Sequence, residues 1–239
     1  MSRQAVEVRG FLLRKVQYRE ADLIVTLFCS SLGKVSAVAR HALRSRRRFG
    51  GCLEPMHTLG LHLAGTGELM ELRAASLSQP RHYLISDLVR MDSAGRALRW
   101  LRDVVPPKSP EPALWRSVSA FLDVLDDRAD TAPLARLADF GLHLLALLGW
   151  GLQLESCVGC GKPCPASASA GVDPKRGGLV CRACGRTQIV VGAELRKRLA
   201  LAAKGVAGCC TVDDAPLSLS LIEQVLEVHA GMSQLRSDR

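Results

Sequence analysis

The runs DLIVTLFC at residues 22–29 and KVSAVA at residues 34–39 have the two-residue apolar period and the β-branched side chains of β-strands. Ser30, Ser31 and Gly33 lie between them, and these residue types favour a turn. The stretch from Asp22 to Ala39 therefore predicts two neighbouring strands.

Three further runs have the same period: VEVRGFLLRKV at residues 6–16, MHTLGLHLA at residues 56–64 and GELMELRA at residues 67–74. Glycines at 65 and 67 supply a turn between the last two. Five successive strands predict a small β-barrel of the OB type, and we expect it to occupy residues 1–80.

After residue 80 the apolar period becomes that of helices, which predicts an α+β protein. A helical bundle domain is expected over residues 81–152 and 192–239. Its first expected apolar stripe comprises Leu84, Leu88, Met91, Leu98, Leu101 and Val105. Pro110 and Pro133 are suited to begin the next two helices, and Gly149 to end the last of them. In an expected C-terminal helix, one face carries Leu219, Ile222, Val225, Leu226 and His229.

Residues 153–191 interrupt the helices and are rich in Cys, Gly, Pro and Ser. Two C-x-x-C pairs, Cys157 with Cys160 and Cys181 with Cys184, have the spacing of a four-thiolate zinc site. Four thiolates leave no position for a water molecule, so the zinc is expected to be structural. Gly161 and Gly185 are expected to turn backbone amides toward the sulfurs. Cys164 is an alternative ligand, and Cys29, Cys52, Cys209 and Cys210 are expected to be small buried side chains.

The sequence carries a formal net charge of +9, which favours a polyanionic partner such as nucleic acid. It has neither an export signal nor an apolar run long enough to span a membrane, so a cytoplasmic, nucleoid-associated protein without membrane contact is expected. No phosphate-binding loop, G-x-S-x-G elbow or H-x-x-x-H pair is present. We therefore expect no enzyme activity.

The segment RHALRSRRR at residues 40–48 holds five arginines and a histidine and follows a predicted strand. In OB barrels such loops bind single strands, and arginine binds phosphate through paired hydrogen bonds. The alternative is a solvated loop. Only ten aromatic residues are present, so affinity is expected to come mainly from phosphates. Arg14 and Lys15 in the first strand, and Arg196 and Lys197 in a later helix, are further candidate DNA contacts.

Several segments in this order resemble the RecO family of bacterial recombination mediators. They are EADLIVTL (20–27), GKVSAVARHALRS (33–45), FGGCLEP (49–55), FGLHLLALLGW (140–150) and LESCVGCG (154–161). The resemblance implies a non-catalytic DNA repair protein that binds single- and double-stranded DNA and anneals complementary strands. It implies RecR as a partner, the C-terminal tail of single-strand binding protein as another, and RecA as an indirect one. The DNA contacts that it implies are Lys34, Arg40, Arg44, Arg46, Arg47 and Arg48.

Two other hypotheses remain open from the residues alone. A zinc-ribbon transcription or translation factor would bind nucleic acid through the cations of the cysteine module, which are Lys162, Lys175, Arg176, Arg182 and Arg186. An interaction adaptor would bind no nucleic acid. Mutation of the arginines at residues 44–48 separates barrel-mediated binding from the zinc-ribbon hypothesis, because only the former depends on them. The adaptor hypothesis instead predicts no gel shift with any oligonucleotide at low salt.

Overall fold

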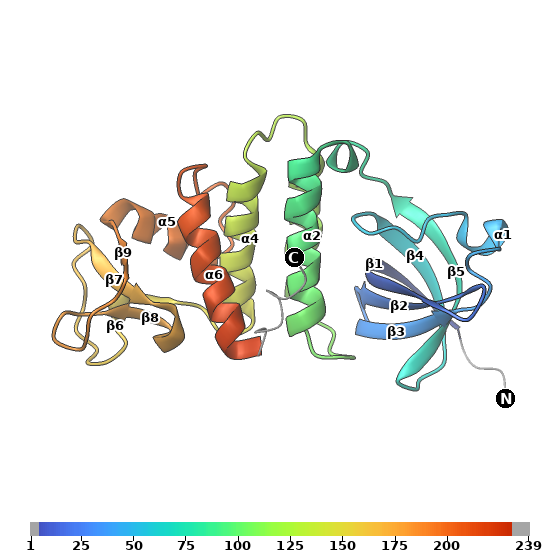
Figure 1. Ribbon diagram of the computed structural model, residues 1–239, viewed down its shortest axis with the longest axis horizontal. Helices are drawn as coiled ribbons and strands as arrows, with labels where there is room; N and C mark the ends of the chain where they lie inside the picture. The colour runs from blue at the N-terminus through green and yellow to red at the C-terminus, as the bar shows by residue number, and fades with distance from the viewer. Residues whose placement is uncertain (1–4, 231–239) are drawn as a thin grey trace. The chain divides into compact units, whose positions relative to one another are not determined.

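The computed structural model describes residues 5–230 (Figure 1). Packing within the chain divides it into two units, residues 1–128 and residues 129–239. The barrel and the helices α2 and α3 belong to the first unit, and the cysteine module belongs to the second with α4, α5 and α6. This division separates helices that the sequence suggested were one domain, and the domain boundaries given above remain a prediction. Within residues 5–230, no helix is both long and apolar enough to cross a membrane.

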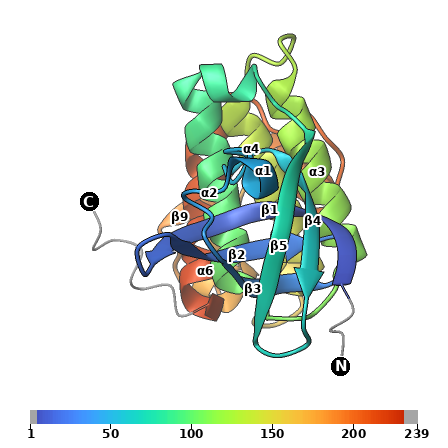
Figure 2. The same ribbon diagram turned by 90° about the vertical axis from the view of Figure 1, so that its right-hand side faces the viewer.

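Five strands form the closed barrel that the sequence predicts (Figure 2). They are β1 (Ala5–Tyr18), β2 (Asp22–Cys29), β3 (Gly33–Ala39), β4 (Thr58–Ala64) and β5 (Leu69–Gln79). Their order around the barrel is β1-β2-β3-β5-β4, and β3 and β5 are parallel while the other pairs are antiparallel. Closure leaves no strand of the barrel with an unpaired edge, which removes the usual site of strand aggregation.

Alternation along the strands fills the barrel with aliphatic side chains. Along β3, for example, Val35, Ala37 and Ala39 are buried while the residues between them are partly exposed. Gly33 begins this strand with a positive φ of 68°, and an added Cβ would overlap the backbone of Ser109. Glycine is therefore required here both by the left-handed backbone and by the lack of space.

The helix α3 (Pro112–Asp126) packs against the barrel through Trp115, whose ring stacks on Phe11 with centroids 4.5 Å apart. Beside this contact, the side chain of Arg81 is only 1% exposed. Its guanidinium donates to the carbonyl of Met56 at 3.0 Å, to Thr58 Oγ1 at 3.1 Å and to Asp123 Oδ1 at 2.7 Å. Arg81 thus joins the barrel to α3, a role that the apolar period does not predict.

Replacing Arg81 by methionine is expected to destabilise the protein by about 2 kcal/mol, because the buried oxygens of Met56 and Thr58 lose their donors. Urea unfolding measures this change as a lower midpoint at an unchanged slope. The matched control is Arg116→Met, since Arg116 is an exposed arginine of the same helix that Arg81 contacts. Equal stability of the two variants would contradict the role given to Arg81.

The first helical segment of the chain differs from its prediction. It is divided into a short 3-10 helix, η1 (Leu84–Ser86), and α2 (Leu88–Val104). Asp87 separates them as the N-cap of α2, and its carboxylate accepts from the backbone N–H groups of Val89 and Arg90. The division rotates the second element, so Leu88 is 83% exposed and its predicted place on the buried stripe is wrong.

The second unit combines helices with a small sheet (Figure 1). Its elements are α4 (Pro133–Leu147), β6 (Gln153–Cys157), β7 (Ala170–Asp173), the 3-10 helix η2 (Pro174–Arg176), β8 (Gly178–Val180), β9 (Ile189–Val191), α5 (Ala193–Ala203) and α6 (Ala215–Ala230). The strand order is β6-β8-β7-β9. Pro133 begins α4 and Gly149 follows its end with a φ of 77°, as the sequence predicts.

The buried face of α6 contains Leu219, Ile222, Val225 and Leu226, which confirms four of the five predicted residues. His229 is exposed instead, and its ring stacks on Trp150 with centroids 5.2 Å apart. An imidazole with a polar edge is cheaper to leave at the surface than to bury without a partner. His229 therefore lies at the surface, where the shared face of the helix leaves the core.

Candidate nucleic-acid interface and metal centre

Residues 40–48, here named the arginine segment, leave the barrel at the end of β3 and return to it at Phe49. Two backbone N–H groups hold the beginning of the segment to the β1–β2 turn and the start of β2. His41 N donates to the side-chain oxygen Oδ1 of Asp22 at 2.7 Å, and Leu43 N donates to the carbonyl of Ala21 at 3.1 Å. Phe49 is 2% exposed and belongs to the barrel core. The segment is consequently a loop fixed at both ends on the barrel, which argues against the disordered-loop alternative.

Three arginines of this segment are exposed: Arg40, Arg44 and Arg47. Arg44 lies 3.5 Å from the carboxylate of Glu20, with 70% and 89% of the two side chains exposed. A salt bridge this exposed contributes little to stability, so a phosphate can replace Glu20 at small cost. These three guanidinium groups are therefore available to an anionic ligand.

Arg48 has a different role. Its Nη2 donates to the carbonyl of Arg40 at 2.7 Å and its Nε to Ser45 Oγ at 3.3 Å. These bonds close the segment on itself and shape the loop that carries the exposed arginines. For Arg46 the backbone lies in the short helix α1 (Arg46–Phe49), and its side chain is outside the part of the chain that the structure describes.

Two of the three predicted lysine contacts are engaged within the protein. Lys34 Nζ donates to the carbonyl of Arg102 at 2.6 Å. Burial lowers the pKa of Lys34, while the nearby Asp103 raises it and Arg102 lowers it. Lys15 Nζ donates to Leu53 O at 3.0 Å and to Glu54 Oε1 at 2.6 Å. The Lys15 side chain is 40% exposed, but both ammonium groups already have acceptors within the protein, so we leave both lysines out of the interface proposed below.

In the second unit, Arg196 is 5% exposed, and its guanidinium contacts Cys164 Sγ and the carbonyl of Pro165. A cation buried in this way cannot reach a phosphate. We therefore leave Arg196 out of the interface proposed below, whereas its neighbour Lys197 is exposed on α5. The helical period places both residues on one helix but does not reveal which of them faces the cysteine module.

The strand register gathers outward-facing side chains of β1, β2 and β3 on one face. Arg14 pairs with Thr26, which pairs with Ser36, and Val16 pairs with Ile24, which pairs with Val38. Paired residues of neighbouring strands point to the same side of a sheet. Arg14 is exposed, so this face, here named the strand face, carries one free cation in its first row.

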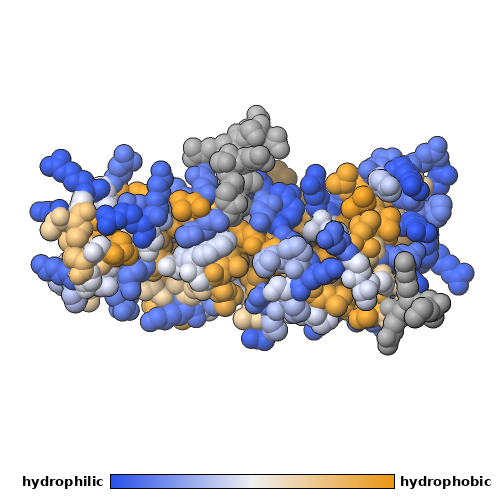
Figure 3. All heavy atoms as spheres, turned by 90° about the horizontal axis from the view of Figure 1, so that it is seen from below, coloured by the Kyte–Doolittle hydropathy of each residue, from blue (hydrophilic) through white to orange (hydrophobic). Residues whose placement is uncertain are grey.

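One basic residue near this face was not among the predicted contacts. Arg19 lies in the β1–β2 turn and lines the same surface hollow as Arg40 and Arg44. It lies outside the arginine segment, and only the tertiary fold brings it close. Its sequence signal is slight: a basic residue in a turn that joins two predicted strands. In the space-filling view, the barrel end at the right carries hydrophilic atoms beside apolar patches (Figure 3).

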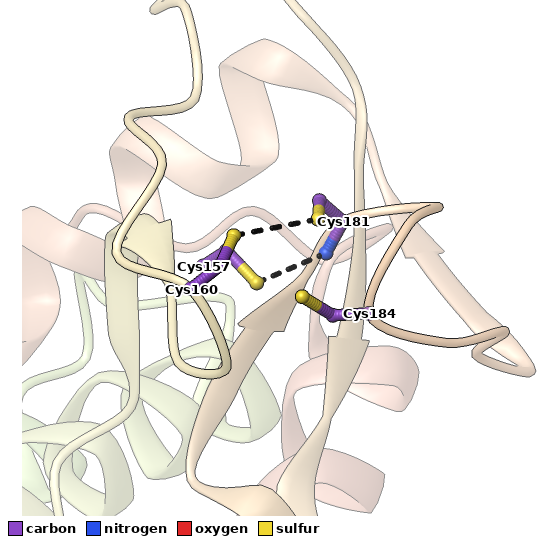
Figure 4. Close-up of side chains that lie close together, drawn as sticks. All are labelled: Cys157, Cys160, Cys181 and Cys184. Atoms are coloured by element: carbon purple, nitrogen blue, oxygen red, sulfur yellow. Dashed lines mark hydrogen bonds between the residues drawn. The ribbon is translucent and has the colours of Figure 1, made fainter.

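The four predicted metal ligands come together. The sulfurs of Cys157, Cys160, Cys181 and Cys184 all lie within 4.8 Å of one another (Figure 4). Cys157 ends β6, and Cys181 directly follows β8, so the pairing of these parallel strands brings the two C-x-x-C pairs side by side. In a tetrahedral site with Zn–S bonds of about 2.3 Å, neighbouring sulfurs lie about 3.8 Å apart. The group could therefore hold a metal ion.

Backbone N–H groups favour thiolates at this site. The amides of Cys181 and Gly159 donate to Cys157 Sγ at 3.3 and 3.4 Å, and these bonds lower the pKa of Cys157 to about 6. The pKa of Cys181 is lowered too, first by the amide of Cys184. Hydrogen bonding to the sulfurs of Cys160, Cys181 and Cys157 raises the pKa of Cys184 to about 12. Thiolates are thus favoured at Cys157 and Cys181, while Cys184 beside them keeps its proton. Metal ions bind the deprotonated form of cysteine, so four sulfurs in this arrangement suit a divalent cation, which would displace the remaining proton.

Two details of the site differ from their predictions. The amide of Gly161 donates to the carbonyl of Cys157 and not to a sulfur, although Gly161 and Gly185 both have positive φ angles of 70° and 152°. Cys164 contacts Arg196 and is not one of the four clustered cysteines, so the alternative ligand set is wrong. Of the other cysteines, Cys29 and Cys210 are buried, as predicted, while Cys52 and Cys209 are only partly buried.

Family models match nearly the whole chain. The model described as "Recombination protein O N terminal" matches residues 1–81, and "Recombination protein O C terminal" matches residues 85–239.

Similar proteins named DNA repair protein RecO are found in several bacteria. The protein of Geobacter metallireducens is 35% identical over 191 residues, which cover 80% of this chain and 77% of the relative. That of an Anaeromyxobacter strain is 35% identical over 217 residues, covering 88% and 84%. That of Pelobacter propionicus is 32% identical over 233 residues, covering 94% and 92%.

Proposed function

We propose, from the premise that this chain belongs to the RecO family of DNA repair proteins, that its barrel clamps single- and double-stranded DNA by the phosphates and anneals complementary strands. The observation that carries the proposal is the arginine segment, which is fixed at both ends on the barrel and presents Arg40, Arg44 and Arg47 to solvent. Guanidinium groups bind phosphates through charge-assisted hydrogen bonds that do not depend on the bases.

Annealing needs a surface that holds a strand without covering the base edges that must pair. Contacts to phosphates position a strand and leave those edges free. Three of the four aromatic residues of the barrel domain, Phe11, Phe28 and Phe49, are buried, so the barrel has little surface for holding bases. This combination suits a protein that brings two strands together better than one that reads a sequence.

The finer steps of this function follow from the family and form part of the same proposal. The protein would act in the cytoplasm at the nucleoid, together with RecR, on strands coated by single-strand binding protein, whose C-terminal tail it would bind. By displacing that coat it would help RecA to load. Chemistry on DNA is not part of the proposal, and the protein would work by binding alone.

The metal that we propose for the four cysteines is one zinc ion with a structural role. Zinc supplies no chemistry to DNA in this arrangement, since four thiolates fill its coordination sphere. The residues would instead use it to hold the loop after β6 against the loop after β8. The small sheet of this module has short strands of three to five residues, which gain little stability from packing alone.

The zinc-ribbon hypothesis has one observation in its favour. Lys162, Arg182 and Arg186 line a hollow of about 830 Å³ beside the cysteines. A zinc ion with four thiolates carries a net charge of −2, however, so these cations have a counter-charge next to them. Their presence is thus weaker support for DNA binding than the arginine segment, whose Arg44 pairs with the 89% exposed carboxylate of Glu20, a partner that a phosphate can replace.

Annealing tests the proposed function directly. Two complementary oligonucleotides coated with single-strand binding protein are expected to anneal several times faster with this protein than without it, because phosphate clamping raises the local concentration of the strands. One strand carries a fluorophore and the other a quencher, so the fall in fluorescence over time measures the rate of annealing. Since the contacts are electrostatic, the acceleration is expected to decline steeply with added salt. A rate equal to that of spontaneous annealing at low salt would overturn the proposal.

A further inference from the structure

A surface hollow of about 630 Å³ lies where the β1–β2 turn meets the end of β3 and the start of β5. We name it the turn pocket. Tyr18, Val38 and Leu69 contribute apolar surface to it, and Arg19, Arg40 and Arg44 contribute cations. The volume is ample for one nucleotide. In barrels of the OB type, the strand surface and the loop between the first two strands are the usual place of oligonucleotide binding.

Tyr18 differs from the other aromatic residues of the barrel. Phe11 and Phe28 are fully buried and Phe49 is 2% exposed, whereas Tyr18 is 42% exposed. The guanidinium of Arg19 lies 5.2 Å from the centre of the Tyr18 ring. Among the described residues of the barrel domain, Tyr18 is thus the one aromatic ring with surface available to a ligand.

The register of the strands continues the turn pocket into the strand face. Val16, Ile24 and Val38 form one row across β1, β2 and β3, and Tyr18 lies two residues beyond Val16 on β1, on the same side of the sheet. In the parallel β3–β5 pair, Leu69 lies beside Ser36. Leu69 is 51% exposed, although such a side chain is usually buried. The ring of Tyr18 therefore borders an apolar strip that water covers in the free protein.

Cations stand at the rim of this strip. Arg40 and Arg44 belong to the arginine segment, and the backbone bond from His41 to Asp22 fixes that segment to the turn that follows Tyr18. Glu20 and Asp22 also line the pocket, but Glu20 is paired with Arg44 and Asp22 accepts from the His41 amide. An aromatic ring with guanidinium groups beside it matches the two parts of a nucleotide, a flat base and a charged phosphate.

We propose that the turn pocket receives one unpaired base of a single strand, which stacks on Tyr18 while its phosphates contact Arg40 and Arg44. This inference rests on the proposed function. It adds to it a contact that distinguishes single-stranded from double-stranded DNA. A base inside a duplex is stacked between its neighbours and cannot reach Tyr18 unless it is extruded, which costs a few kcal/mol. Arginine contacts hold single strands and duplexes alike, whereas the Tyr18 contact favours the single strand.

The strand face also offers this single strand a path from Tyr18 to Arg14. Arg14 is exposed on the same side of β1, four residues before Tyr18, which corresponds to about 13 Å along a strand. Successive phosphates of a stacked strand are about 3.4 Å apart along its axis, and an unstacked strand is longer. A strand with its base on Tyr18 would therefore reach Arg14 with a phosphate within about four nucleotides.

Equilibrium binding of the full chain to three probes tests the inference: an oligothymidine, a duplex of the same length, and an oligomer of the same length that consists of abasic sites. Tyr18→Ala is expected to weaken oligothymidine binding about fivefold or more, because stacking on one base is worth about 1–3 kcal/mol. Binding of the duplex and the abasic oligomer is expected to change less than about twofold. Tyr18→Phe keeps the ring and is expected to bind all three probes like the unaltered protein.

Two outcomes would overturn the inference. One is equal affinity of Tyr18→Ala and the unaltered protein for oligothymidine, and the other is an equal loss for all three probes. The unaltered protein adds a measurement that needs no variant, since it should bind oligothymidine more tightly than the abasic oligomer. If the arginine variants described in the Discussion lose binding while Tyr18→Ala does not, only the base contact fails. If the arginine variants keep full affinity, the proposed function itself fails.

Discussion

Replacing Arg44 and Arg47 together by glutamate is expected to weaken binding to single- and double-stranded DNA by about a hundredfold to a thousandfold. Both side chains are exposed on the arginine segment. Each charge-assisted hydrogen bond is worth about 1.5–3 kcal/mol, so the loss of two such contacts accounts for a change of this size. The introduced carboxylates also repel the phosphates, which adds to the effect.

The measurement is fluorescence anisotropy with a labelled oligonucleotide and a labelled duplex at several salt concentrations. Loss of two phosphate contacts is expected to make the plot of log affinity against log salt less steep by about 1.4 for a single strand. Annealing should fall in parallel with affinity.

The matched control changes the same total charge at another place in the same unit. Arg99 on α2 and Arg116 on α3 are exposed and lie outside the barrel. Their joint replacement by glutamate lowers the net charge equally but leaves the arginine segment intact. Only a small loss of DNA affinity is expected for this control, since it changes the long-range electrostatic potential of the protein but removes no phosphate contact. If both double variants lost affinity to the same extent, net charge alone and not the segment would explain binding.

Removal of the metal is expected to unfold the cysteine module while the barrel remains folded. Binding of zinc to four thiolates contributes about 10–16 kcal/mol in small zinc modules, and this free energy is available only to the folded form. Replacing Cys181 by serine removes one of the four sulfurs that lie within 4.8 Å of one another. The variant is expected to contain less than one zinc ion per chain and to be cleaved by protease within residues 153–191.

The control for this prediction is Cys164→Ser. Cys164 belongs to the same module but is not one of the four clustered sulfurs. Zinc measured by a colorimetric chelator should therefore be equal in this variant and in the unaltered protein. A strong chelator should make the unaltered protein as sensitive to protease as Cys181→Ser. A module that keeps its protection without metal would show that its packing is sufficient, and the structural role of zinc would be withdrawn.

In the barrel, the apolar period predicts where the strands lie but not how all of them pair. All five strands lie where the two-residue period predicts them, because alternation reports directly which side of a strand is buried. The parallel pairing of β3 with β5, which closes the barrel, was not contained in that pattern. Pairing between strands that are distant in sequence depends on how the connection between them folds, and here that connection includes the arginine segment.

Arg81 and Trp115 illustrate the same limit at the barrel–helix contact. The sequence indicates that α3 has an apolar face, but it gives no sign that Trp115 stacks on Phe11 or that a guanidinium is buried beside them. A buried cation is stable only if several acceptors converge on it, and here they come from Met56, Thr58 and Asp123. No local pattern records such a convergence.

The metal centre required less of the tertiary structure than the interface did. The spacing of two C-x-x-C pairs was sufficient to predict which four sulfurs cluster, because each pair already places two sulfurs on one turn. Whether a cationic side chain is free to bind DNA, in contrast, depends on whether acceptor atoms of the folded protein lie within its reach. Arg40 and Arg44 are exposed at the turn pocket, while Lys34 and Arg196 have the same kind of charge but bond to atoms of the protein itself.

The sequence by itself determined the strands of the barrel, the helices on either side of the cysteine module, the four clustered sulfurs and the presence of an arginine-rich loop. Each of these depends on neighbours within a few residues along the chain or on a fixed spacing. Only the tertiary structure decided which cations are free, which are buried, and that Tyr18 lies exposed beside Arg40 and Arg44. The reason is physical: a side chain's exposure and partners are set by segments that are distant in sequence and meet only when the chain has folded.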